Sequence, residues 1–135
     1  MNSLSILLID DDEIERMKFR KVCEKNQFNH LVIEANDGEK AISLLNNPEN
    51  SFDLIILDLN MPKMNGFEFL KKLKRDNEFQ HIPVVIMSTS SSYSDLKACY
   101  SIGVAGYFSK PLYFNEYSNK IVSLLNYWEK NELIS

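Results

Sequence analysis

Polar side chains that could do chemistry follow four of the five short apolar runs in this sequence. Each stands just past the carboxyl end of its run; in chain order they are Asp10 and Asp11, Asp58, Ser88, and Lys110. Crowded carboxylates repel one another unless a cation offsets their charge, and Mg²⁺ prefers such oxygen ligands. A carboxylate beside that ion can accept a phosphoryl group, while a lysine and a hydroxyl stabilise charge on the transferring oxygens. These residue types therefore suit one divalent cation and one phosphoryl group.

The apolar runs themselves are typical of strands in a parallel sheet that helices bury on both faces. They alternate with stretches of helical periodicity, a pattern that predicts repeated βα units. We expect strands at 4–9, 30–35, 53–57, 83–87 and 105–108, with a helix after each. In open α/β sheets, ligands bind at the carboxyl ends of the strands, where the strand order reverses. The polar groups listed above should therefore converge in one site.

Capping and periodicity locate the first and last helices. The first should begin after Asp12, a favourable capping residue, with Glu15 completing a capping box. We expect Ile14, Met17 and the pair Val22–Cys23 to supply its apolar residues. The last helix carries an amphipathic stripe at helical spacing, made of Phe114, Tyr117, Ile121, Leu124, Leu125 and Trp128.

Length, composition and net charge limit the classes of protein to which this chain can belong. At 135 residues, with 44% hydrophobic and 25% charged residues, the chain fits one globular domain spanning 1–135. A formal net charge of -4 argues against nucleic-acid binding. The run 4–9 is too short for a signal peptide or a membrane span, so we expect a cytoplasmic protein without membrane contact. Cys23 and Cys99 are expected to be reduced thiols rather than a disulfide.

Each polar residue also has a simpler explanation when it is taken alone. The acidic run could cap a helix and offset its dipole, which explains Asp12 well. It explains Asp10 and Asp11 less well, because they stand on the strand side of the junction. Asp58 could be an ordinary turn residue, and Lys110 an ordinary loop residue. The joint pattern is what favours a functional site.

The order of these residues resembles the receiver domain of two-component response regulators. The segments 57–62, 65–66 and 103–107 resemble the same family, and the resemblance extends over 4–128. It implies a flavodoxin-like α/β fold, in which a doubly wound, five-stranded parallel sheet of order 2-1-3-4-5 is covered by five helices.

The resemblance also implies a metal site for Mg²⁺ and a phosphoacceptor. Asp58 matches the phosphoacceptor, and it would also bind the metal. Asp11 matches a direct metal ligand, and Asp10 matches the acid that acts through metal-bound water. Asn60 matches the residue whose backbone carbonyl reaches the ion.

A switch is implied by the same resemblance. Ser88 matches the switch hydroxyl, Tyr107 its aromatic partner, and Lys110 the lysine that binds the phosphoryl group. The bond between Lys110 and Pro111 is expected to be cis, as in the family.

The implied function is that of a phosphoacceptor in a two-component phosphorelay. The donor would be a sensor histidine kinase or a histidine phosphotransfer protein. We expect no enzyme activity beyond self-phosphorylation and slow autodephosphorylation. The segments 88–91 and 127–128 are similar to short stand-alone receivers paired with bacteriophytochromes. A homodimer could form through the fourth helix, fifth strand and fifth helix, with Tyr113, Lys120 and Tyr127 facing outward or sideward.

Two other functions remain open at this stage. A phosphatase of the haloacid dehalogenase type also uses an aspartyl phosphate, and Asp10 and Asp12 have its spacing. However, Ile14 stands where that family needs threonine. The second alternative is an adaptor with the same fold that works without phosphorylation, although such a protein has little use for an intact acidic site.

Overall fold

Strands and helices alternate along the chain, as the sequence pattern predicts. The computed structural model describes residues 3–61 and 64–134, so Pro62 and Lys63 of the expected 60–66 loop lie outside the described residues. The elements are β1 (Ser5–Ile9), α1 (Glu13–Lys25), β2 (Leu31–Ala35), α2 (Gly38–Asn46), β3 (Leu54–Leu57), α3 (Gly66–Arg75), β4 (Val84–Ser88), α4 (Tyr93–Ile102), β5 (Gly106–Ser109) and α5 (Phe114–Glu129). All strand pairs are parallel and the sheet order is β2-β1-β3-β4-β5, which confirms the predicted fold.

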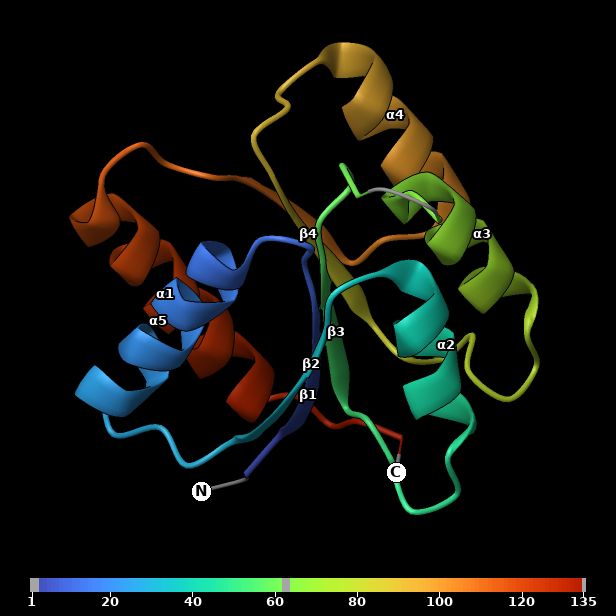
Figure 1. Cartoon of the computed structure of the whole chain (residues 1–135), viewed down its shortest axis with the longest axis horizontal. Helices are drawn as coiled ribbons and strands as arrows, with labels where there is room; N and C mark the ends of the chain where they lie inside the picture. Colours follow the sequence, from blue (N-terminus) through green and yellow to red (C-terminus); the bar gives the residue numbers. More distant parts are fainter. Residues whose placement is uncertain (1–2, 62–63, 135) are drawn as a thin grey trace.

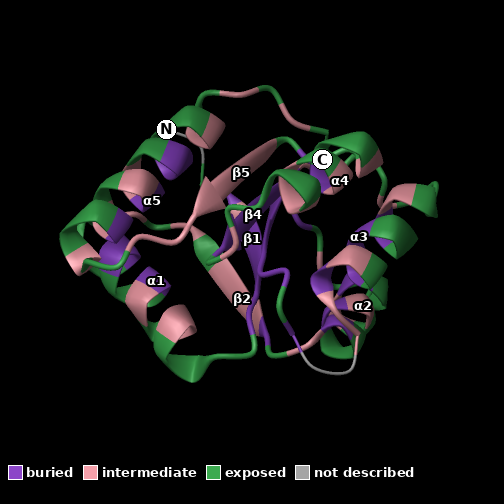
Figure 2. Cartoon of the chain, turned by 90° about the horizontal axis from the view of Figure 1, so that it is seen from above, coloured by how far each residue is buried: buried purple, intermediate pink, exposed green. Residues whose placement is uncertain are grey.

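Helices cover both faces of the sheet. Figure 1 shows α1 and α5 on one side and α2, α3 and α4 on the other. Successive residues of a strand point to opposite faces. In β1, Ile6 and Leu8 therefore pack in the core beneath α1 and α5, while Leu7 and Ile9 pack in the core beneath α2, α3 and α4. The central strands are buried, and the edge strands β2 and β5 are largely half-exposed (Figure 2).

The helix ends follow local capping chemistry. The side chain of Asp12 accepts the Ile14 N–H at 2.9 Å, so it caps α1 as expected. The expected box with Glu15 is not formed, because the Asp12 N–H donates to Asp10 Oδ1 and Glu15 pairs with Lys18. Helix α4 ends at Gly103, whose φ of 125° lies in a region that favours glycine.

The buried face of α1 includes the expected Val22 and Cys23 but not the expected Ile14 and Met17. Ile14 and Met17 are 61% and 50% exposed, whereas Phe19, Val22 and Cys23 are buried. Two apolar stripes compete on this helix, and Phe19 has the larger apolar surface to bury. The helix is therefore rotated so that Phe19 faces the sheet, which leaves Ile14 and Met17 in solvent.

Helix α5 carries the predicted amphipathic stripe. Tyr117, Ile121, Leu124 and Leu125 are buried, and the two ends of the stripe are half-buried. Lys120 does not extend freely into solvent, because its Nζ donates to the Ser109 carbonyl at 2.9 Å. None of the helices in the described part of the chain has the length and apolar character needed to cross a bilayer.

The peptide bond between Lys110 and Pro111 is trans, so the expected cis bond is wrong. A trans bond before proline is favoured by about 0.5–1 kcal/mol unless packing enforces a tight turn. The segment that follows lacks such packing, since Leu112 is 86% exposed and Tyr113 is also exposed.

Cys23 and Cys99 are buried free thiols, as predicted. Burial raises the pKa of each thiol to about 11. Because the thiolate is the reactive form, both side chains serve packing rather than redox chemistry.

Candidate functional site

The acidic residues converge where β1 and β3 end. Ile9 pairs with Leu57 across these two neighbouring strands, so the residues that follow them, Asp10 and Asp58, emerge side by side. One carboxylate oxygen from each of Asp10, Asp11 and Asp58 lies within 4.8 Å of the others. This is the convergence that the strand-end positions predict.

Asp10 is held by hydrogen bonds on every side. Its N–H donates to the Ala35 carbonyl at 3.1 Å. One carboxylate oxygen accepts the Asp12 N–H at 3.0 Å, and the other accepts from Lys110 Nζ at 2.9 Å. Asp11, in contrast, is solvent-exposed. The two adjacent acids therefore differ in freedom: Asp10 is fixed, and Asp11 is open to an incoming ion.

Asp58 is a buried carboxyl beside like charges. Its side chain is held by a backbone hydrogen bond from Asn60 N to Oδ1 at 3.3 Å, and Lys110 Nζ lies 3.9 Å from the same oxygen. Burial, with further repulsion from Asp10 and Asp11, raises the pKa of Asp58 to about 7 despite the opposing effects of Lys110 and Asn60. The ionised carboxylate thus needs another positive charge nearby.

Lys110 supplies the ammonium group of the site. The backbone N–H of Lys110 donates to the Ser88 carbonyl at 2.7 Å. This bond extends the pairing of β4 and β5 by one residue and directs the Lys110 side chain toward the acidic residues. Burial alone would lower the pKa of Lys110, but attraction to Asp10 and then Asp58 raises it overall. The lysine therefore stays charged at neutral pH.

Ser90 links the two expected switch residues, Ser88 and Tyr107, and the sequence pattern did not predict this role. The Ser90 N–H donates to Ser88 Oγ at 3.1 Å, and the Tyr107 hydroxyl donates to the Ser90 carbonyl at 2.8 Å. Ser90 Oγ also donates to Asp95 Oδ2 of α4 at 2.6 Å. Its position two residues past the end of β4 is the sequence feature that could have indicated this role. One residue thus connects Ser88 to both Tyr107 and α4.

Helix α3 begins directly against the backbone that follows Asp58. The Gly66 N–H donates to the Leu59 carbonyl at 2.9 Å. A Cβ at Gly66 would lie 2.5 Å from Leu59 Cα and 2.7 Å from the Asp58 carbonyl oxygen. Only glycine permits this close approach, so Gly66 helps to fix the backbone at Asp58 and Leu59.

The donor set fits a hard divalent cation. All three convergent side chains offer carboxylate oxygens, which Mg²⁺ prefers over nitrogen or sulfur. Asn60, the fourth residue expected to contribute, is an exposed residue two positions after Asp58. The residues present are therefore compatible with the metal that the sequence implies.

The chain belongs to the response regulator receiver domain family, whose model matches residues 6–122. Among curated proteins, it is 32% identical over 127 residues to the probable methanogenesis regulatory protein FilR2 of Methanothrix harundinacea, covering 91% of this chain and 82% of that protein. It is 30% identical over 128 residues to the response regulator Rcp1 of Synechocystis, covering 91% of this chain and 87% of Rcp1.

Solved structures support the similarity to short phytochrome-associated regulators. The phosphorylated cyanobacterial phytochrome response regulator RcpA superposes with a TM-score of 0.93 at 27% identity, covering 99% of this chain and 100% of RcpA. The Mn²⁺-bound form of Rcp1 gives a TM-score of 0.88 at 29% identity, covering 98% and 99% of the two chains. The predicted family is thus confirmed, as is the predicted similarity to phytochrome-associated response regulators.

Proposed function

We propose that this protein is a phosphoacceptor response regulator that takes a phosphoryl group on Asp58. The observation that carries the proposal is the convergence of three carboxylates within 4.8 Å, with Lys110 Nζ 3.9 Å from Asp58. A receiver that did not accept phosphoryl groups would gain nothing from so much buried like charge.

The proposed reaction is a displacement at phosphorus. An oxygen of the Asp58 carboxylate attacks the phosphorus of a phosphohistidine, the N–P bond breaks, and the imidazole leaves with the electron pair and takes up a proton. Lys110 holds the equatorial oxygens, on which negative charge is spread in the transition state. Asp10, Asp11 and Asp58, with the Asn60 carbonyl, would hold Mg²⁺, which when bound neutralises part of that charge.

The same residues would carry the signal onward. Phosphorylation adds nearly two negative charges and three acceptor oxygens at the strand ends. Movement of the Ser88 hydroxyl toward those oxygens would break its bond from the Ser90 N–H, which at present links it to Tyr107. Tyr107 and α4 would then rearrange together, because Ser90 contacts both.

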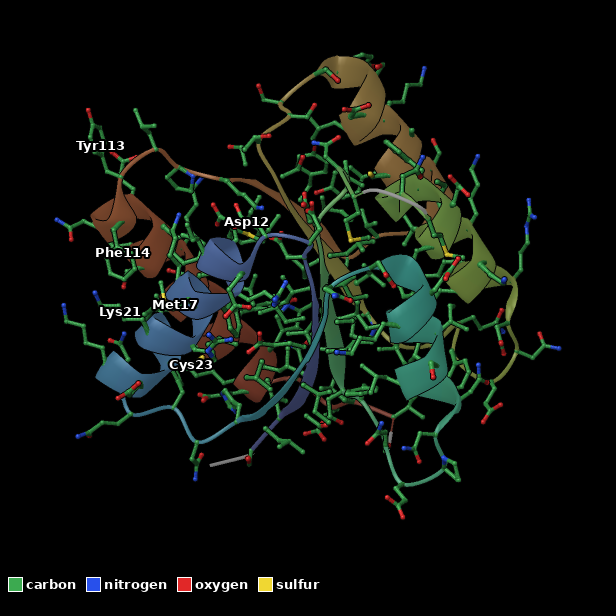
Figure 3. The ribbon with its side chains drawn as sticks, viewed as in Figure 1. Asp12, Met17, Lys21, Cys23, Tyr113 and Phe114 are labelled. Carbon is green, nitrogen blue, oxygen red and sulfur yellow. The ribbon has the colours of Figure 1, made fainter. Side chains whose placement is uncertain are left out.

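The phosphodonor is proposed to be a sensor histidine kinase or a histidine phosphotransfer protein in the cytoplasm. Exposed apolar side chains lie on α1 and at the start of α5: Ile14, Met17, Leu112 and Tyr113. Figure 3 shows Phe114 beside Lys21 of α1, with Tyr113 farther along the segment before α5, and Lys21 Nζ lies 5.3 Å from the centre of the Phe114 ring. A donor that must reach Asp58 would meet this surface, and contact with the donor would explain its apolar exposure.

A phosphatase of the haloacid dehalogenase type is less well supported by this geometry. Its second aspartate would be Asp12, but that side chain is exposed and caps α1. Asp58, which that mechanism does not need, is the buried acid with the raised pKa. We propose that the protein modifies only itself and loses the phosphoryl group slowly.

Labelling with acetyl phosphate and Mg²⁺ tests the function. Intact-mass spectrometry should show one added phosphoryl group on the wild type and none on Asp58→Asn. Asp12→Asn is the matched control, because asparagine caps helices as well as aspartate does. It should label normally, whereas loss of labelling in Asp12→Asn with retention in Asp58→Asn would favour the phosphatase. Absence of labelling in the wild type would favour the adaptor.

A further inference from the structure

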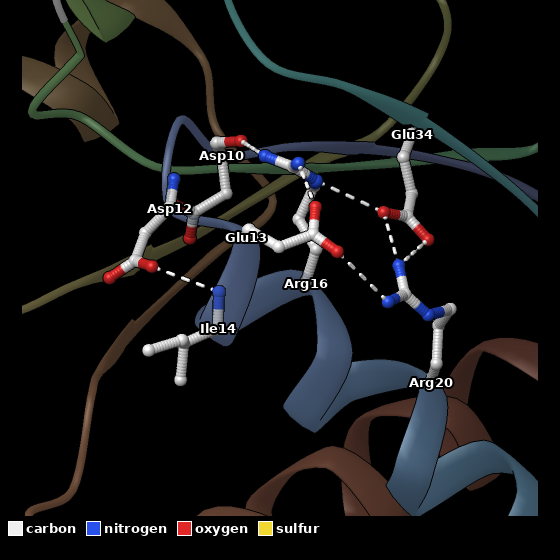
Figure 4. Close-up of polar contacts among 7 residues, drawn as sticks. All are labelled: Asp10, Asp12, Glu13, Ile14, Arg16, Arg20 and Glu34. Atoms are coloured by element: carbon white, nitrogen blue, oxygen red, sulfur yellow. Dashed lines mark hydrogen bonds and ion pairs between the residues drawn. The ribbon is translucent and has the colours of Figure 1, made fainter.

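Arg16 connects α1 to the backbone of the acidic site. Its Nη1 donates to the Asp10 carbonyl oxygen at 2.7 Å, and its Nε donates to Glu34 Oε1 of β2 at 3.0 Å. Nη2 donates to Glu13. Figure 4 shows these contacts around the guanidinium group of Arg16, and the Arg16 side chain is only 12% exposed.

The Asp10 carbonyl lies just past the end of the β1 ladder. The Asp10 N–H donates to the Ala35 carbonyl of β2, but the Asp10 carbonyl lies beyond the last paired residues of β1 and β2. Within residues 3–61 and 64–134, the hydrogen bond that it accepts comes from Arg16. A buried carbonyl left without a donor is unfavourable, so this contact stabilises one particular orientation of the turn.

The orientation of the Asp10 carbonyl determines the position of the Asp11 backbone. The Asp10 carbonyl and the Asp11 N–H belong to one planar peptide unit, so fixing the oxygen fixes the plane. The next atom along the chain is the Asp11 Cα, which carries an expected metal ligand. Arg16 therefore acts on the metal site through the backbone, although its side chain does not contact the carboxylates there.

The contribution of Arg16 is geometric rather than a matter of net charge. Glu13 and Glu34 both pair with the guanidinium and offset most of its positive charge. Arg20 pairs with the same two glutamates but does not contact Asp10. The planar guanidinium donates from three separate nitrogens held in a rigid fork, whereas the lysine ammonium donates from a single nitrogen and cannot reach all three acceptors in this geometry.

We propose that Arg16 is a positioning residue for divalent-cation binding, acting by orienting the Asp10–Asp11 peptide. The proposal rests on the proposed function, because it assumes that the acidic site binds Mg²⁺. Arg16→Met removes the donors while keeping most of the side-chain length. Arg20→Met is the matched control, since it removes ion pairs to Glu13 and Glu34 and leaves the Asp10 contact intact.

Calorimetric titration of Mg²⁺ tests the proposal without any phosphoryl transfer. We expect Arg16→Met to weaken Mg²⁺ binding about tenfold, as removing an orienting partner of a metal ligand commonly does. Arg16→Lys should lie between that variant and the wild type, and Arg20→Met should stay within about twofold of the wild type. In labelling by acetyl phosphate, Arg16→Met should need more Mg²⁺ for half-maximal rate but reach a rate near that of the wild type at saturation.

Three results would overturn the proposal. One is Mg²⁺ affinity in Arg16→Met equal to that of the wild type. Another is equal weakening in Arg16→Met and Arg20→Met, which would assign the effect to the ion-pair network. The third is a reduced maximal rate with an unchanged Mg²⁺ midpoint. If Arg16→Met does not fold, Arg16→Lys compared with Arg20→Lys decides in the same way. Wild-type protein that binds no Mg²⁺ would instead contradict the metal site of the proposed function.

Discussion

The adjacent carboxylates of Asp10 and Asp11 have opposite surroundings. Both oxygens of Asp10 already accept hydrogen bonds, from the Asp12 N–H and from Lys110 Nζ. The Asp11 side chain is exposed. An ion that enters the site can thus bind Asp11 without breaking an existing contact, whereas direct coordination by Asp10 would compete with Lys110.

This difference predicts unequal effects of alanine substitutions on metal binding. Asp11→Ala should weaken Mg²⁺ binding at least tenfold, because it removes an available ligand oxygen, and Asp10→Ala should weaken it only about threefold. Calorimetry on the two variants at one pH and ionic strength measures both constants. A greater loss in Asp10→Ala would reverse the assignment of the direct ligand.

The pKa of Asp58 predicts how stability depends on pH. Because this pKa is about 7 in the folded protein and ordinarily 3.8, the folded state between these values holds a proton that the unfolded state has lost. Stability of the metal-free protein should therefore decrease as pH rises from about 4 to about 7. Asp58→Asn lacks this loss, so it should be more stable than the wild type above pH 7 by about 1–2 kcal/mol, a value discounted for solvent at the site.

Urea unfolding with a metal chelator, at pH 5 and pH 8, measures this difference. The advantage of Asp58→Asn should be larger at pH 8 than at pH 5, and adding Mg²⁺ should reduce it by stabilising the wild type. An advantage that is the same at both pH values would mean that the Asp58 carboxyl does not titrate in this range.

The sequence predicted the acidic residues, Ser88 and Lys110 because strand ends are visible as changes from apolar to polar residues. Arg16 and Ser90 escaped prediction for a different reason. Each acts through a backbone carbonyl, at Asp10 and Ser90 respectively, and a carbonyl is present at every position of a chain. Nothing in the residue types marks which carbonyl lacks a strand partner, so such contacts emerge only from the folded geometry.

At the level of the elements, the start of α3 packs tightly against the backbone of Asp58 and Leu59. Adding a Cβ at Gly66 would bring it within 2.5 Å of Leu59 Cα, a backbone atom that cannot move away as a flexible side chain could. Gly66→Ala should therefore destabilise the fold by about 2 kcal/mol or more and displace the backbone at Asp58.

Gly106→Ala in β5 is the control for this prediction. A Cβ there would meet its nearest neighbours at 3.9 Å, an ordinary contact. Alanine at that position should change stability by less than about 0.5 kcal/mol, since it adds no clash and reduces chain entropy in the unfolded state. Thermal unfolding of both variants, with labelling of Asp58 as a second measure, tests the pair. Equal stability of the two variants would contradict the close approach at Gly66.

The positions of the strands were predictable from their apolar runs, and their order from the resemblance to receiver domains, but the rotation of α1 was not. Strands of a parallel sheet are apolar on both faces, so their runs stand out whichever way each residue points. Helix α1 has apolar residues on two sides, with Ile14 and Met17 on one and Phe19, Val22 and Cys23 on the other. The side that faces the sheet depends on how well each group of side chains packs against the sheet and α5. This packing depends on residues far away in the sequence, so the helix sequence alone does not reveal it.

At the scale of the whole molecule, large apolar side chains are exposed at several places among the described residues, and two of these places bear on partner binding. The first, on α1 and at the start of α5, lies beside the site and is the proposed donor surface. The second is on α4, where Tyr93 and Tyr100 are exposed; Tyr127, toward the end of α5, is also exposed. Tyr107, on the edge strand β5, contacts the loop before α4 through the Ser90 carbonyl. The second surface is thus connected to Ser88, and its arrangement should depend on phosphorylation.

We therefore expect this second surface to form a homodimer that phosphorylation strengthens. Aromatic residues are enriched at interfaces, and a large shift between monomer and dimer needs only about 5.5 kcal/mol of differential affinity. Sedimentation velocity should show the beryllofluoride-treated wild type associating more than the untreated protein, while Tyr107→Ala should not respond to treatment. Met17→Ser is the control: it removes an exposed apolar side chain from the donor surface and should associate like the wild type. Unchanged sedimentation of the wild type on treatment would contradict the dimer, and loss of association in Met17→Ser would move the interface to α1.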